Sequence, residues 1–276
     1  MRYENKTVVI TGAGGVLCSA FARSIAAQGG RVALIDINEN AISDVASEIS
    51  SQGGVAKYYK ASVLDKNELI IAHEKILADF GKCDILINGA GGNNPRATTN
   101  NEYYQQGDEE RDDIKTFFNL DKEDFGFVFD LNIMGTLIPT QVFSCDMVKG
   151  GGCIINISSM NAFTPLTKIP AYSSAKAAVS NFTKWLSVHF ANTGIRVNAI
   201  APGFFVTKQN KALLFNEDGT PTKRTEKILN ATPMNRFGKP EELFGALDFL
   251  CDENMSAFVT GVVIPVDGGF SAYSGV

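Results

Sequence analysis

Residues 7–36, TVVITGAGGVLCSAFARSIAAQGGRVALID, form a strand, a glycine-rich turn, a helix and a second strand in succession. TVVIT is a short apolar run rich in β-branched residues, which is typical of a buried strand. The helix after the glycines is predicted to extend to about Gln28, and Gly29-Gly30 ends it. RVALID is the second strand. Alternation of this kind predicts an α/β fold built on a parallel sheet.

The same alternation continues along the rest of the chain, without an internal repeat or a linker. It predicts a single domain over residues 1–276, a Rossmann-type doubly wound sheet of seven parallel strands in the order 3-2-1-4-5-6-7 with helices on both faces. Asp65 is a candidate N-cap, and Pro139 is expected to kink its helix. The remaining predicted strands are 55–60, 83–88, 152–158, 195–201 and 262–266. The remaining predicted helices are 40–51, 65–80, 121–148, the helix from Tyr172 to about Asn192, and 240–251.

Two segments depart from the alternation. Residues 93–120 form a polar, acidic insertion after the fourth strand, and long loops of this kind in compact domains are usually functional or mobile. We expect its DEERDD core to be solvated surface and its ends to form part of an active-site wall. Residues 204–232 are irregular and partly helical, as expected of a segment that closes over a substrate.

Composition excludes several classes of function. The formal charge is −5 and there is no clustered Lys and Arg, which argues against nucleic-acid binding. Five scattered cysteines without C-x-x-C spacing indicate a reducing, cytoplasmic compartment. No apolar run approaches the ~20 residues that cross a bilayer, and no signal peptide precedes the first strand, so no membrane association is expected. His73 and His189 are expected to be ordinary helix residues, which leaves no predicted metal site.

Candidate catalytic groups lie in residues 152–176, GCIINISSMNAFTPLTKIPAYSSAK, which run from a strand into a helix. Tyr172 and Lys176 are four residues apart and share one helix face. An ammonium beside a phenol favours the phenolate and lowers its pKa towards the range of acid/base catalysis. Ser159, at the end of the strand, offers a hydroxyl to a substrate oxygen. Tyr-x-x-x-Lys alone is a short motif that also occurs by chance, although Tyr172 is the only one of seven tyrosines with lysine at this spacing.

A nucleotide site is predicted at the glycine-rich turn. Gly12, Gly14 and Gly15 let backbone N–H groups approach a pyrophosphate at the positive end of a helix. Asp36 ends the second strand, where a carboxylate accepts hydrogen bonds from ribose hydroxyls and repels a 2′-phosphate. No Lys or Arg adjoins Asp36 in the sequence, so NAD(H) is expected rather than NADP(H). The alternative for Asp36 is a helix-capping role.

These motifs together resemble the short-chain dehydrogenase/reductase family over the whole chain. The matching residues are T-G-x-x-x-V-x-C at 11–18, N-G-A-G at 88–91, Asn132, Ser159, the Tyr172–Lys176 motif and P-G-x-x-x-T at 202–207. The resemblance implies that Tyr172 is the acid/base, that Lys176 lowers its pKa and holds the nicotinamide ribose, and that Ser159 orients the substrate oxygen. It also implies that Asn132 holds a water connecting Lys176 to solvent, and that the protein is a homo-oligomer, commonly a tetramer.

The resemblance also predicts which residues contact the cofactor. Val16 and Cys18 stand where the family usually has glycine, and Ser62 replaces an aspartate that commonly touches adenine. The expected cofactor-binding residues are Gly12, Gly14, Gly15, Val16, Leu17, Asp36, Ser62, Val63, Asn88, Ala90, Gly91, Tyr172, Lys176, Pro202, Gly203, Phe205 and Thr207.

Within the family, the chain is most similar to a subgroup labelled D-mannonate oxidoreductase (fructuronate reductase), on SSMNAFTPLTKIPAYS, PGFFVTKQNKALLFNEDGTPT and IPVDGGFSAYSGV. This similarity implies NADH-dependent reduction of D-fructuronate to D-mannonate, with a small sugar acid as the substrate. Two alternatives stay open: a reductase of another polyol or sugar acid, for example of the gluconate type, and a non-catalytic NAD-binding protein.

A sugar-acid substrate requires a cation for its carboxylate, because a desolvated carboxylate without a partner is costly. The basic residues nearest the predicted pocket are Arg96, Lys168, Lys208 and Lys211. Each of them is also explained as solvated surface; Arg96 is favoured for its bidentate fork. Asn93, Asn161 and Gln209 are candidate partners for substrate hydroxyls.

Overall fold

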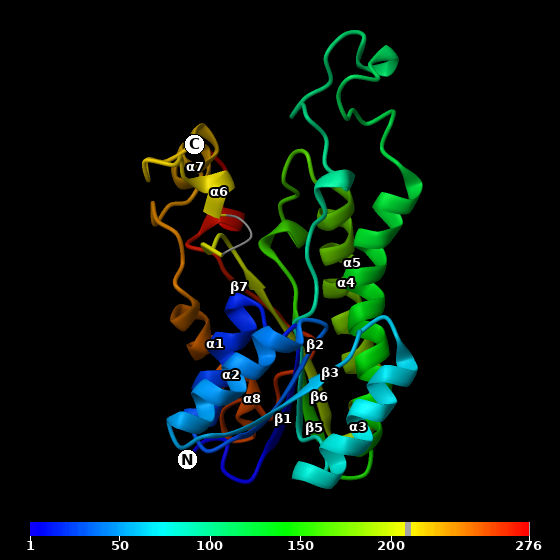
Figure 1. Ribbon diagram of the computed structural model, residues 1–276, viewed down its shortest axis with the longest axis vertical. Helices are drawn as coiled ribbons and strands as arrows, with labels where there is room; N and C mark the ends of the chain where they lie inside the picture. The colour runs from blue at the N-terminus through cyan, green and yellow to red at the C-terminus, as the bar shows by residue number, and fades with distance from the viewer. Residues whose placement is uncertain (208–210, 276) are drawn as a thin grey trace.

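The computed structural model describes residues 1–207 and 211–275, and its centre is one seven-stranded sheet (Figure 1). The strand order is β3-β2-β1-β4-β5-β6-β7 and every neighbouring pair is parallel, so the predicted topology is confirmed. The strands are β1 (Thr7–Thr11), β2 (Arg31–Asp36), β3 (Val55–Lys60), β4 (Ile85–Asn88), β5 (Gly152–Ile157), β6 (Ile195–Pro202) and β7 (Val263–Val266).

Helices cover both faces of the sheet. One face carries α1 (Val16–Ala27), α2 (Glu39–Ser51) and α8 (Phe244–Cys251), and the other carries α3 (Lys66–Phe80), α4 (Lys122–Phe143) and α5 (Pro170–His189) (Figure 1). The shorter elements are α6 (Lys211–Leu214), α7 (Lys223–Asn230), α9 (Glu253–Ser256) and the 3₁₀ turns η1 (Pro95–Ala97), η2 (Asp108–Glu110), η3 (Ser144–Asp146), η4 (Met160–Ala162), η5 (Ala191–Thr193), η6 (Pro240–Leu243) and η7 (Phe270–Ala272).

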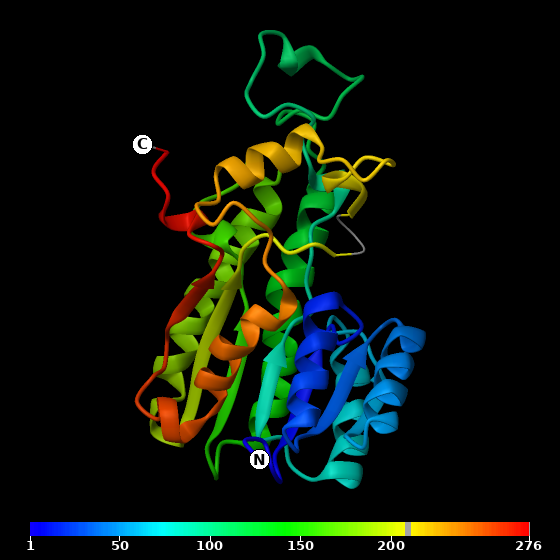
Figure 2. The same cartoon turned by 90° about the vertical axis from the view of Figure 1, so that its left-hand side faces the viewer.

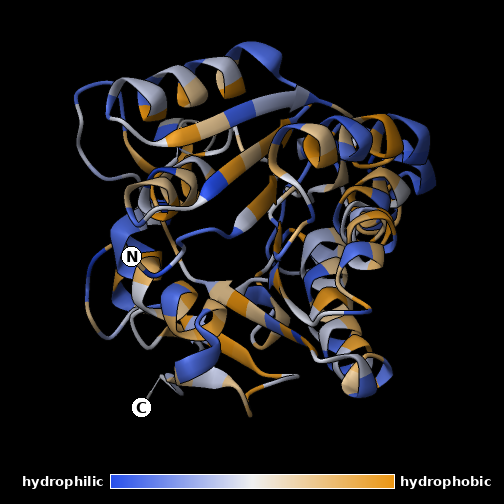
Figure 3. Cartoon of the chain, turned by 90° about the horizontal axis from the view of Figure 1, so that it is seen from below, coloured by the Kyte–Doolittle hydropathy of each residue, from blue (hydrophilic) through white to orange (hydrophobic). Residues whose placement is uncertain are grey.

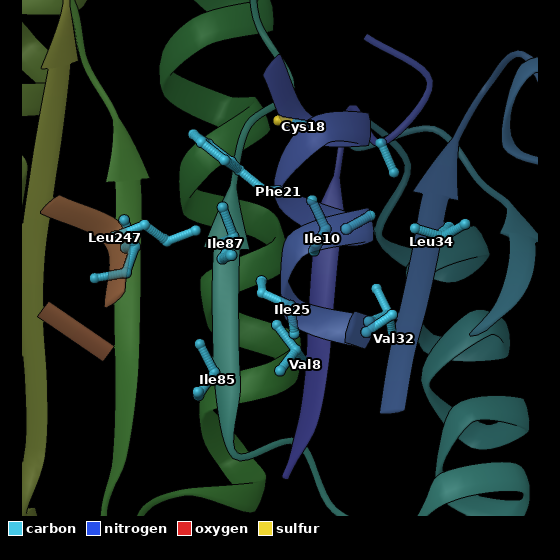
Figure 4. Packing of buried hydrophobic residues seen from close by; sticks show 14 of the residues in the cluster. Val8, Ile10, Cys18, Phe21, Ile25, Val32, Leu34, Ile85, Ile87 and Leu247 are labelled. Carbon is cyan, nitrogen blue, oxygen red and sulfur yellow. The ribbon is translucent and has the colours of Figure 1, made fainter. Parts of the chain in front are cut away.

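The side-chain alternation of a strand divides the core into two layers. Val8 and Ile10 of β1 pack against Phe21 and Ile25 of α1, whereas Val9 belongs to the cluster on the opposite face (Figure 4). Seen from below, the helices alternate between hydrophobic and hydrophilic residues along their length, as expected of helices that bury one face (Figure 3). Burial on both faces explains why these strands appear in the sequence as continuous apolar runs.

Several predicted boundaries were wrong at helix ends. The helix expected over 121–148 ends at Phe143 and continues as η3, and the helix expected to reach Asn192 ends at His189. The helix expected over 240–251 begins as the 3₁₀ turn η6. Tighter terminal turns satisfy some of the backbone groups that an α-helix leaves unpaired at its ends, and local propensity does not separate the two forms. The N-cap prediction for Asp65 is confirmed, because its side chain accepts from the backbone N–H groups of Asn67 and Glu68.

The insertion of residues 93–120 extends away from the sheet and its helices, at the end where the strands terminate (Figures 1 and 2). Its acidic core is exposed as predicted, except for Asp108. This carboxylate is buried because it accepts hydrogen bonds from the backbone N–H of Gln105 (3.0 Å) and the side-chain amide of Asn101 (3.3 Å). Helices α6 and α7, within the segment predicted to close over a substrate, lie near the same end of the molecule (Figure 2).

The two histidines occupy helices, as predicted. His73 of α3 is hydrogen-bonded to Asp146 (3.0 Å), and the ring of His189 at the end of α5 stacks on Trp185. Among the described residues, no group of three or more His, Cys, Asp and Glu side chains is arranged to hold a metal ion. No described helix has the length and apolar character needed to span a membrane.

Candidate active site

Two glycine-containing turns are in direct contact at the ends of β1 and β4. Gly12 has φ +65°, and a Cβ on it would lie 2.8 Å from the backbone of Ala90. Thr11 joins the same turns, because its hydroxyl oxygen accepts from the backbone N–H groups of Gly89 (3.1 Å) and Ala90 (3.3 Å). Only glycine at position 12 allows this approach. The predicted crevice between the two turns is therefore formed by backbone packed against backbone.

Helix α1 begins at this crevice without a side-chain cap. Its N-cap is Gly15, Val16 is its first residue, and no side chain accepts from its first turn. The backbone N–H groups at the start of a helix carry partial positive charge and are ready to bind an anion. Gly14 is required beside them, because a Cβ there would lie 2.9 Å from Ala41 Cβ and 3.2 Å from a carboxylate oxygen of Asp36. Gly12, Gly14, Gly15, Val16 and Leu17 thus lie in one turn.

Asp36 braces the glycine-rich turn. Its carboxylate accepts from the backbone N–H of Gly14 (3.0 Å) and from that of Asn38 (2.9 Å). The alternative role as a helix cap is wrong, because Asn38 caps α2 by accepting from Ala41 N–H (3.2 Å). Sequence reasoning missed one nearby cation. Lys60 stands beside Asp36 in the register of β2 and β3, although its ammonium lies 3.6 Å from Glu39.

Cys18, which replaces a family glycine, is buried beneath the turn from β4. A Cβ on Gly89 would lie only 2.1 Å from its sulfur, so the thiol occupies space that a side chain at Gly89 would need. Burial raises the pKa of Cys18 to about 12; the Asp36 carboxylate also raises it and the Lys176 ammonium opposes this. A thiol with this pKa is neutral at physiological pH and acts here as a small packing group.

Other predicted cofactor residues line the same edge of the sheet. Val63 is buried against Gly135 of α4, while Ser62 N–H donates to Glu68 (2.7 Å). The Asn88 amide lies in a buried network, where it donates to Thr140 Oγ1 and to Asn156 Oδ1 (both 2.9 Å). The Asn88 side chain therefore joins β4 to β5 and α4, beneath the turn that carries Ala90 and Gly91.

The turn after β6 closes the opposite side of this edge. Gly203 follows Pro202, its N–H donates to Val266 O (3.0 Å), and a Cβ on it would lie 2.6 Å from Asp267 Cα. Phe205 is buried, and its ring fills the space beside Gly238, where a Cβ would lie 2.5 Å from the nearest ring carbon. Thr207 is half-buried and is the last residue described before Lys211.

The predicted catalytic groups lie in the turn after β5, on α5 and, for Asn132, on α4. Ser159 is the N-cap of η4, and its hydroxyl oxygen accepts from the backbone N–H of Asn161 (3.2 Å). This bond leaves the hydroxyl hydrogen of Ser159 available as a donor. Tyr172 is half-buried in the first turn of α5, next to Ala171 and Val128. Burial raises the pKa of the Tyr172 phenol, and a hydrogen bond with the Ser159 side chain lowers it.

Lys176 is buried one turn further along α5. Its ammonium donates to the carbonyl oxygen of Ile157 (2.7 Å) and lies 5.7 Å from the centroid of the Tyr172 ring. Burial lowers the pKa of Lys176 to about 8, and Cys18 opposes this shift. The expectation that Lys176 lowers the pKa of Tyr172 is wrong for this structure, because desolvation of the phenol dominates and the ammonium is directed to the carbonyl.

Asn132 is held next to Lys176 by the turn after β4. The fully buried Asn132 amide donates to Gly92 O (2.9 Å) and Val128 O (2.7 Å), and its oxygen accepts from Gly92 N–H (3.2 Å). A Cβ on Gly91 would lie 2.6 Å from the Asn132 side-chain oxygen and 3.1 Å from the Lys176 nitrogen. The two polar groups therefore converge at Gly91, where a side chain would displace them.

The predicted substrate residues are not gathered as expected. Arg96 forms an ion pair with Asp124, with Nε 3.0 Å from one carboxylate oxygen, and the Lys115 ammonium lies 3.8 Å from the other oxygen. Asn93 is exposed and donates to Thr98 (3.0 Å). Asn161 is buried, and its side-chain oxygen has no partner among the described residues.

The other predicted cations are more scattered. Lys168 has φ +71° and its carbonyl oxygen accepts from Thr99 N–H (2.8 Å). Lys211 is exposed at the start of α6. Lys208 and Gln209 lie outside the described residues. Sequence reasoning missed Asp124 and Lys115, because an acidic residue in the first turn of a helix is usually explained by the helix dipole.

Comparison with known proteins agrees with this geometry. Residues 6–218 match the model of the short chain dehydrogenase family. The chain belongs to this family. It is 62% identical over 274 residues to an uncharacterized oxidoreductase of Haemophilus influenzae, covering 99% of this chain and 95% of the relative.

Two solved structures place the chain more closely within the family. A crystal structure from Haemophilus influenzae, of a protein proposed to be a D-mannonate oxidoreductase and containing bound NAD, has 61% sequence identity, a TM-score of 0.94 and coverage of 99% and 97% of the two chains. A gluconate 5-dehydrogenase from Burkholderia cenocepacia, in complex with NADP and tartrate, has 27% identity, a TM-score of 0.84 and coverage of 99% and 97%.

Proposed function

We propose that this protein is an NAD(H)-dependent oxidoreductase that interconverts a ketone and a secondary alcohol on a sugar acid, with D-fructuronate and D-mannonate as the substrate pair. The observation that carries the proposal is that Tyr172 lies beside both Ser159 and Lys176, while Lys176 and Asn132 converge at Gly91. A protein that only bound a nucleotide would have no need of a proton donor, its hydroxyl partner and a buried ammonium at one edge of the sheet.

The residues present fit a dinucleotide. The uncapped start of α1 would hold the pyrophosphate, beside the turns of Gly12 and Ala90, which pack backbone against backbone. Asp36 would accept from the adenosine ribose, since its carboxylate is already directed at the turn through Gly14. When bound, NADH supplies the hydride for the carbonyl carbon. The preference for NAD(H) over NADP(H) follows from the Asp36 charge, which repels a 2′-phosphate.

Proton transfer is assigned to Tyr172. The raised pKa keeps the phenol protonated at neutral pH, so it is prepared to donate to the carbonyl oxygen of a substrate. Ser159 donates its hydroxyl hydrogen to the same oxygen, because its bond with Asn161 N–H uses only a lone pair of the hydroxyl oxygen. The Lys176 ammonium, one helical turn away, would hold the nicotinamide ribose, as the family resemblance implies. Asn132, adjacent to Lys176, is positioned to hold a water that returns a proton from solvent.

The sugar-acid assignment rests on Arg96 and on the relatives. The exposed Arg96 uses its Nε side for Asp124, which leaves the outer edge of the guanidinium for a carboxylate. Arg96 adjoins Ala97, which packs with Ala171 beside Tyr172. The similarity to a protein proposed to be a D-mannonate oxidoreductase, and the tartrate in a gluconate 5-dehydrogenase, support a polyhydroxylated acid. We further propose a cytoplasmic homo-oligomer, a tetramer by family resemblance.

The test is a measurement of NADH oxidation against hexuronates, hexulosonates and ketoses, and of NAD⁺ reduction against neutral polyols, repeated with NADPH and NADP⁺. D-fructuronate is expected to give the highest kcat/KM, with NADH preferred. Higher kcat/KM with another keto acid would replace the substrate but keep the enzyme class. NADH binding without turnover on any member of the panel would favour the alternative, a non-catalytic NAD-binding protein.

A further inference from the structure

We infer that Glu102 of the insertion is a positioning residue that holds the substrate-closing segment over the active site through Lys227 of α7. The inference rests on the proposed function and on the expectation, made from the sequence, that the segment of residues 204–232 closes over the substrate. It assigns a role to the insertion of residues 93–120, which the catalytic groups do not explain. Glu102 does not touch the reacting atoms, and it acts through the position of α7.

The contact itself is a two-point ion pair between segments distant in sequence. The Lys227 ammonium lies 3.0 Å from each carboxylate oxygen of Glu102. The Glu102 side chain is 31% exposed, whereas that of Lys227 is 68% exposed. The Lys227 hydrogen bond and its charge hold the pKa of Glu102 below its ordinary value, with further contributions from Lys168 and Arg224. Glu102 is therefore ionised at neutral pH, and the charges of Lys227, Lys168 and Arg224 all favour its ionised form.

The side of the contact that carries Glu102 is fixed next to the catalytic helix. Thr99 N–H donates to the carbonyl oxygen of Lys168 (2.8 Å), two residues before α5 begins. Asn100 N–H donates to Lys115 O, and Lys115 N–H donates to the side chain of Asn100 (both 2.7 Å). The Thr99 bond ties the base of the insertion to the segment that leads into Tyr172, and the two Asn100–Lys115 bonds join the two arms of the insertion to each other. Glu102 is two residues beyond this tie.

Lys227, on the other side of the contact, lies on α7, which is hydrogen-bonded to α6. Thr222, the N-cap of α7, donates its hydroxyl to Leu213 O (2.9 Å) and its N–H to Leu214 O (3.0 Å). The Thr225 hydroxyl also donates to Leu214 O (2.5 Å). Helices α6 and α7 are thus joined to each other by hydrogen bonds. A contact that fixes Lys227 on α7 therefore also fixes the position of α6. Figure 2 shows α7 beside the base of the insertion.

The strength of the pair suits a closure that must open in every catalytic cycle. Exposed ion pairs are weak, and their loss changes an equilibrium by about two- to fivefold. A buried pair at this position would hold the segment closed against product release. We therefore expect Glu102 and Lys227 to set the closed fraction of the segment without affecting the chemical step.

The experiment uses the full chain with Glu102→Gln, Lys227→Gln and the charge swap Glu102→Lys with Lys227→Glu. Asp113→Asn is the matched control, because Asp113 pairs with Arg111 within the insertion and does not contact α7. Amide hydrogen exchange over residues 211–230 needs no substrate. It is expected to become about two- to fivefold faster in both single variants, unchanged in Asp113→Asn, and largely restored in the swap.

Steady-state kinetics then gives the functional consequence. KM for the sugar acid is expected to rise by about two- to fivefold in the single variants, with kcat unchanged or raised. Exchange in the Glu102→Gln variant equal to that of the Asp113→Asn control, or a swap that fails to restore it, would overturn the inference. Failure of the proposed function can be told apart from failure of this inference. In the first case the wild-type protein turns over no sugar acid, but amide exchange over residues 211–230 still becomes faster in the single variants.

Discussion

Two regions of the proposed active site are held by different kinds of contact: the edge of the sheet, with Asn132 and Lys176, and the mouth of the site, with Arg96 and Lys227. At the edge, Asn132 and Lys176 are buried, and their polar atoms bind backbone groups of Gly92, Val128 and Ile157. At the mouth, Arg96 and Lys227 are largely exposed and bind the carboxylates of other side chains. A group fixed by buried backbone keeps one geometry, whereas an exposed ion pair exchanges partners at little cost. In the proposed function, the chemistry therefore takes place on the rigid part of the site, and the substrate is recognised by the adaptable part.

The largest effect is expected at the edge, from Tyr172→Phe. The ring and its packing against Ala171 are kept, and only the hydroxyl that transfers the proton is lost. We expect kcat to fall by about 10²–10⁴-fold, with NADH affinity within a few-fold of wild type by fluorescence titration. Turnover within threefold of wild type would show that another group is the acid.

Asp36→Ala is expected to weaken NADH binding by an amount corresponding to about 1.5–3 kcal/mol. Both the ribose hydrogen bonds and the brace on Gly14 are removed, and the advantage over NADPH should narrow because the repulsion of a 2′-phosphate is lost. Asp36→Asn separates the two roles, since it keeps an acceptor for Gly14 without the charge. A wild-type preference for NADPH would refute the role of Asp36 in selecting NAD(H). Lys60, which lies beside Asp36 in the register of β2 and β3, would then be the candidate partner of the 2′-phosphate.

Gly91→Ala tests whether the edge is as rigid as its contacts imply. The new methyl group would collide with the Asn132 oxygen and approach the Lys176 nitrogen. Overpacking of this kind destabilises by about 1–3 kcal/mol, and kcat should fall with it. Gly92→Ala is the matched control, because a Cβ there meets nothing within 4 Å. Equal thermal stability and kcat in the two variants would contradict a rigid edge.

The buried Lys176 predicts a pH dependence of stability. Its pKa is about 8 in the folded protein against an ordinary value of 10.5, so between these values the unfolded chain binds more protons and stability rises with pH. Denaturant titrations should show wild type gaining about 1.5 kcal/mol relative to Lys176→Met between about pH 8 and pH 9.5. The range stops short of pH 10, where the raised pKa of Tyr172 begins to oppose the gain. A parallel pH dependence in the two proteins would place the ammonium in water.

The smallest effect is expected at the mouth, from Arg96→Ala. An exposed cation contributes about 1 kcal/mol, so KM for the sugar acid should rise about fivefold while a neutral polyol analogue is almost unaffected. Arg111→Ala, which removes another exposed arginine of the same insertion, should change neither. The same KM change for acid and neutral substrates would remove the physical support for a carboxylate at this position.

Much of the fold could be predicted because its determinants are local. The apolar runs at 7–11, 31–36 and 152–157 are buried on both faces, and their alternation with helical segments leaves few topologies. The candidate catalytic residues could also be grouped from the sequence, since Ser159, Tyr172 and Lys176 occupy one strand–turn–helix unit. The ends of the helices were less predictable, because 3₁₀ and α turns differ by contacts that local propensity does not encode.

The sequence by itself determined which groups are available for chemistry and on which elements they lie. Only the tertiary structure decided their charge states and partners, because these depend on groups distant in sequence. The Lys176 ammonium donates a hydrogen bond to the Ile157 carbonyl oxygen. The largest effect on the pKa of Tyr172 is burial of the phenol, which raises it. Asp124 engages Arg96, and Glu102 meets Lys227 across 125 positions of the chain. Spacing along a helix is set by its 3.6-residue turn, whereas these pairings are set by how separate segments pack, and no local pattern specifies them.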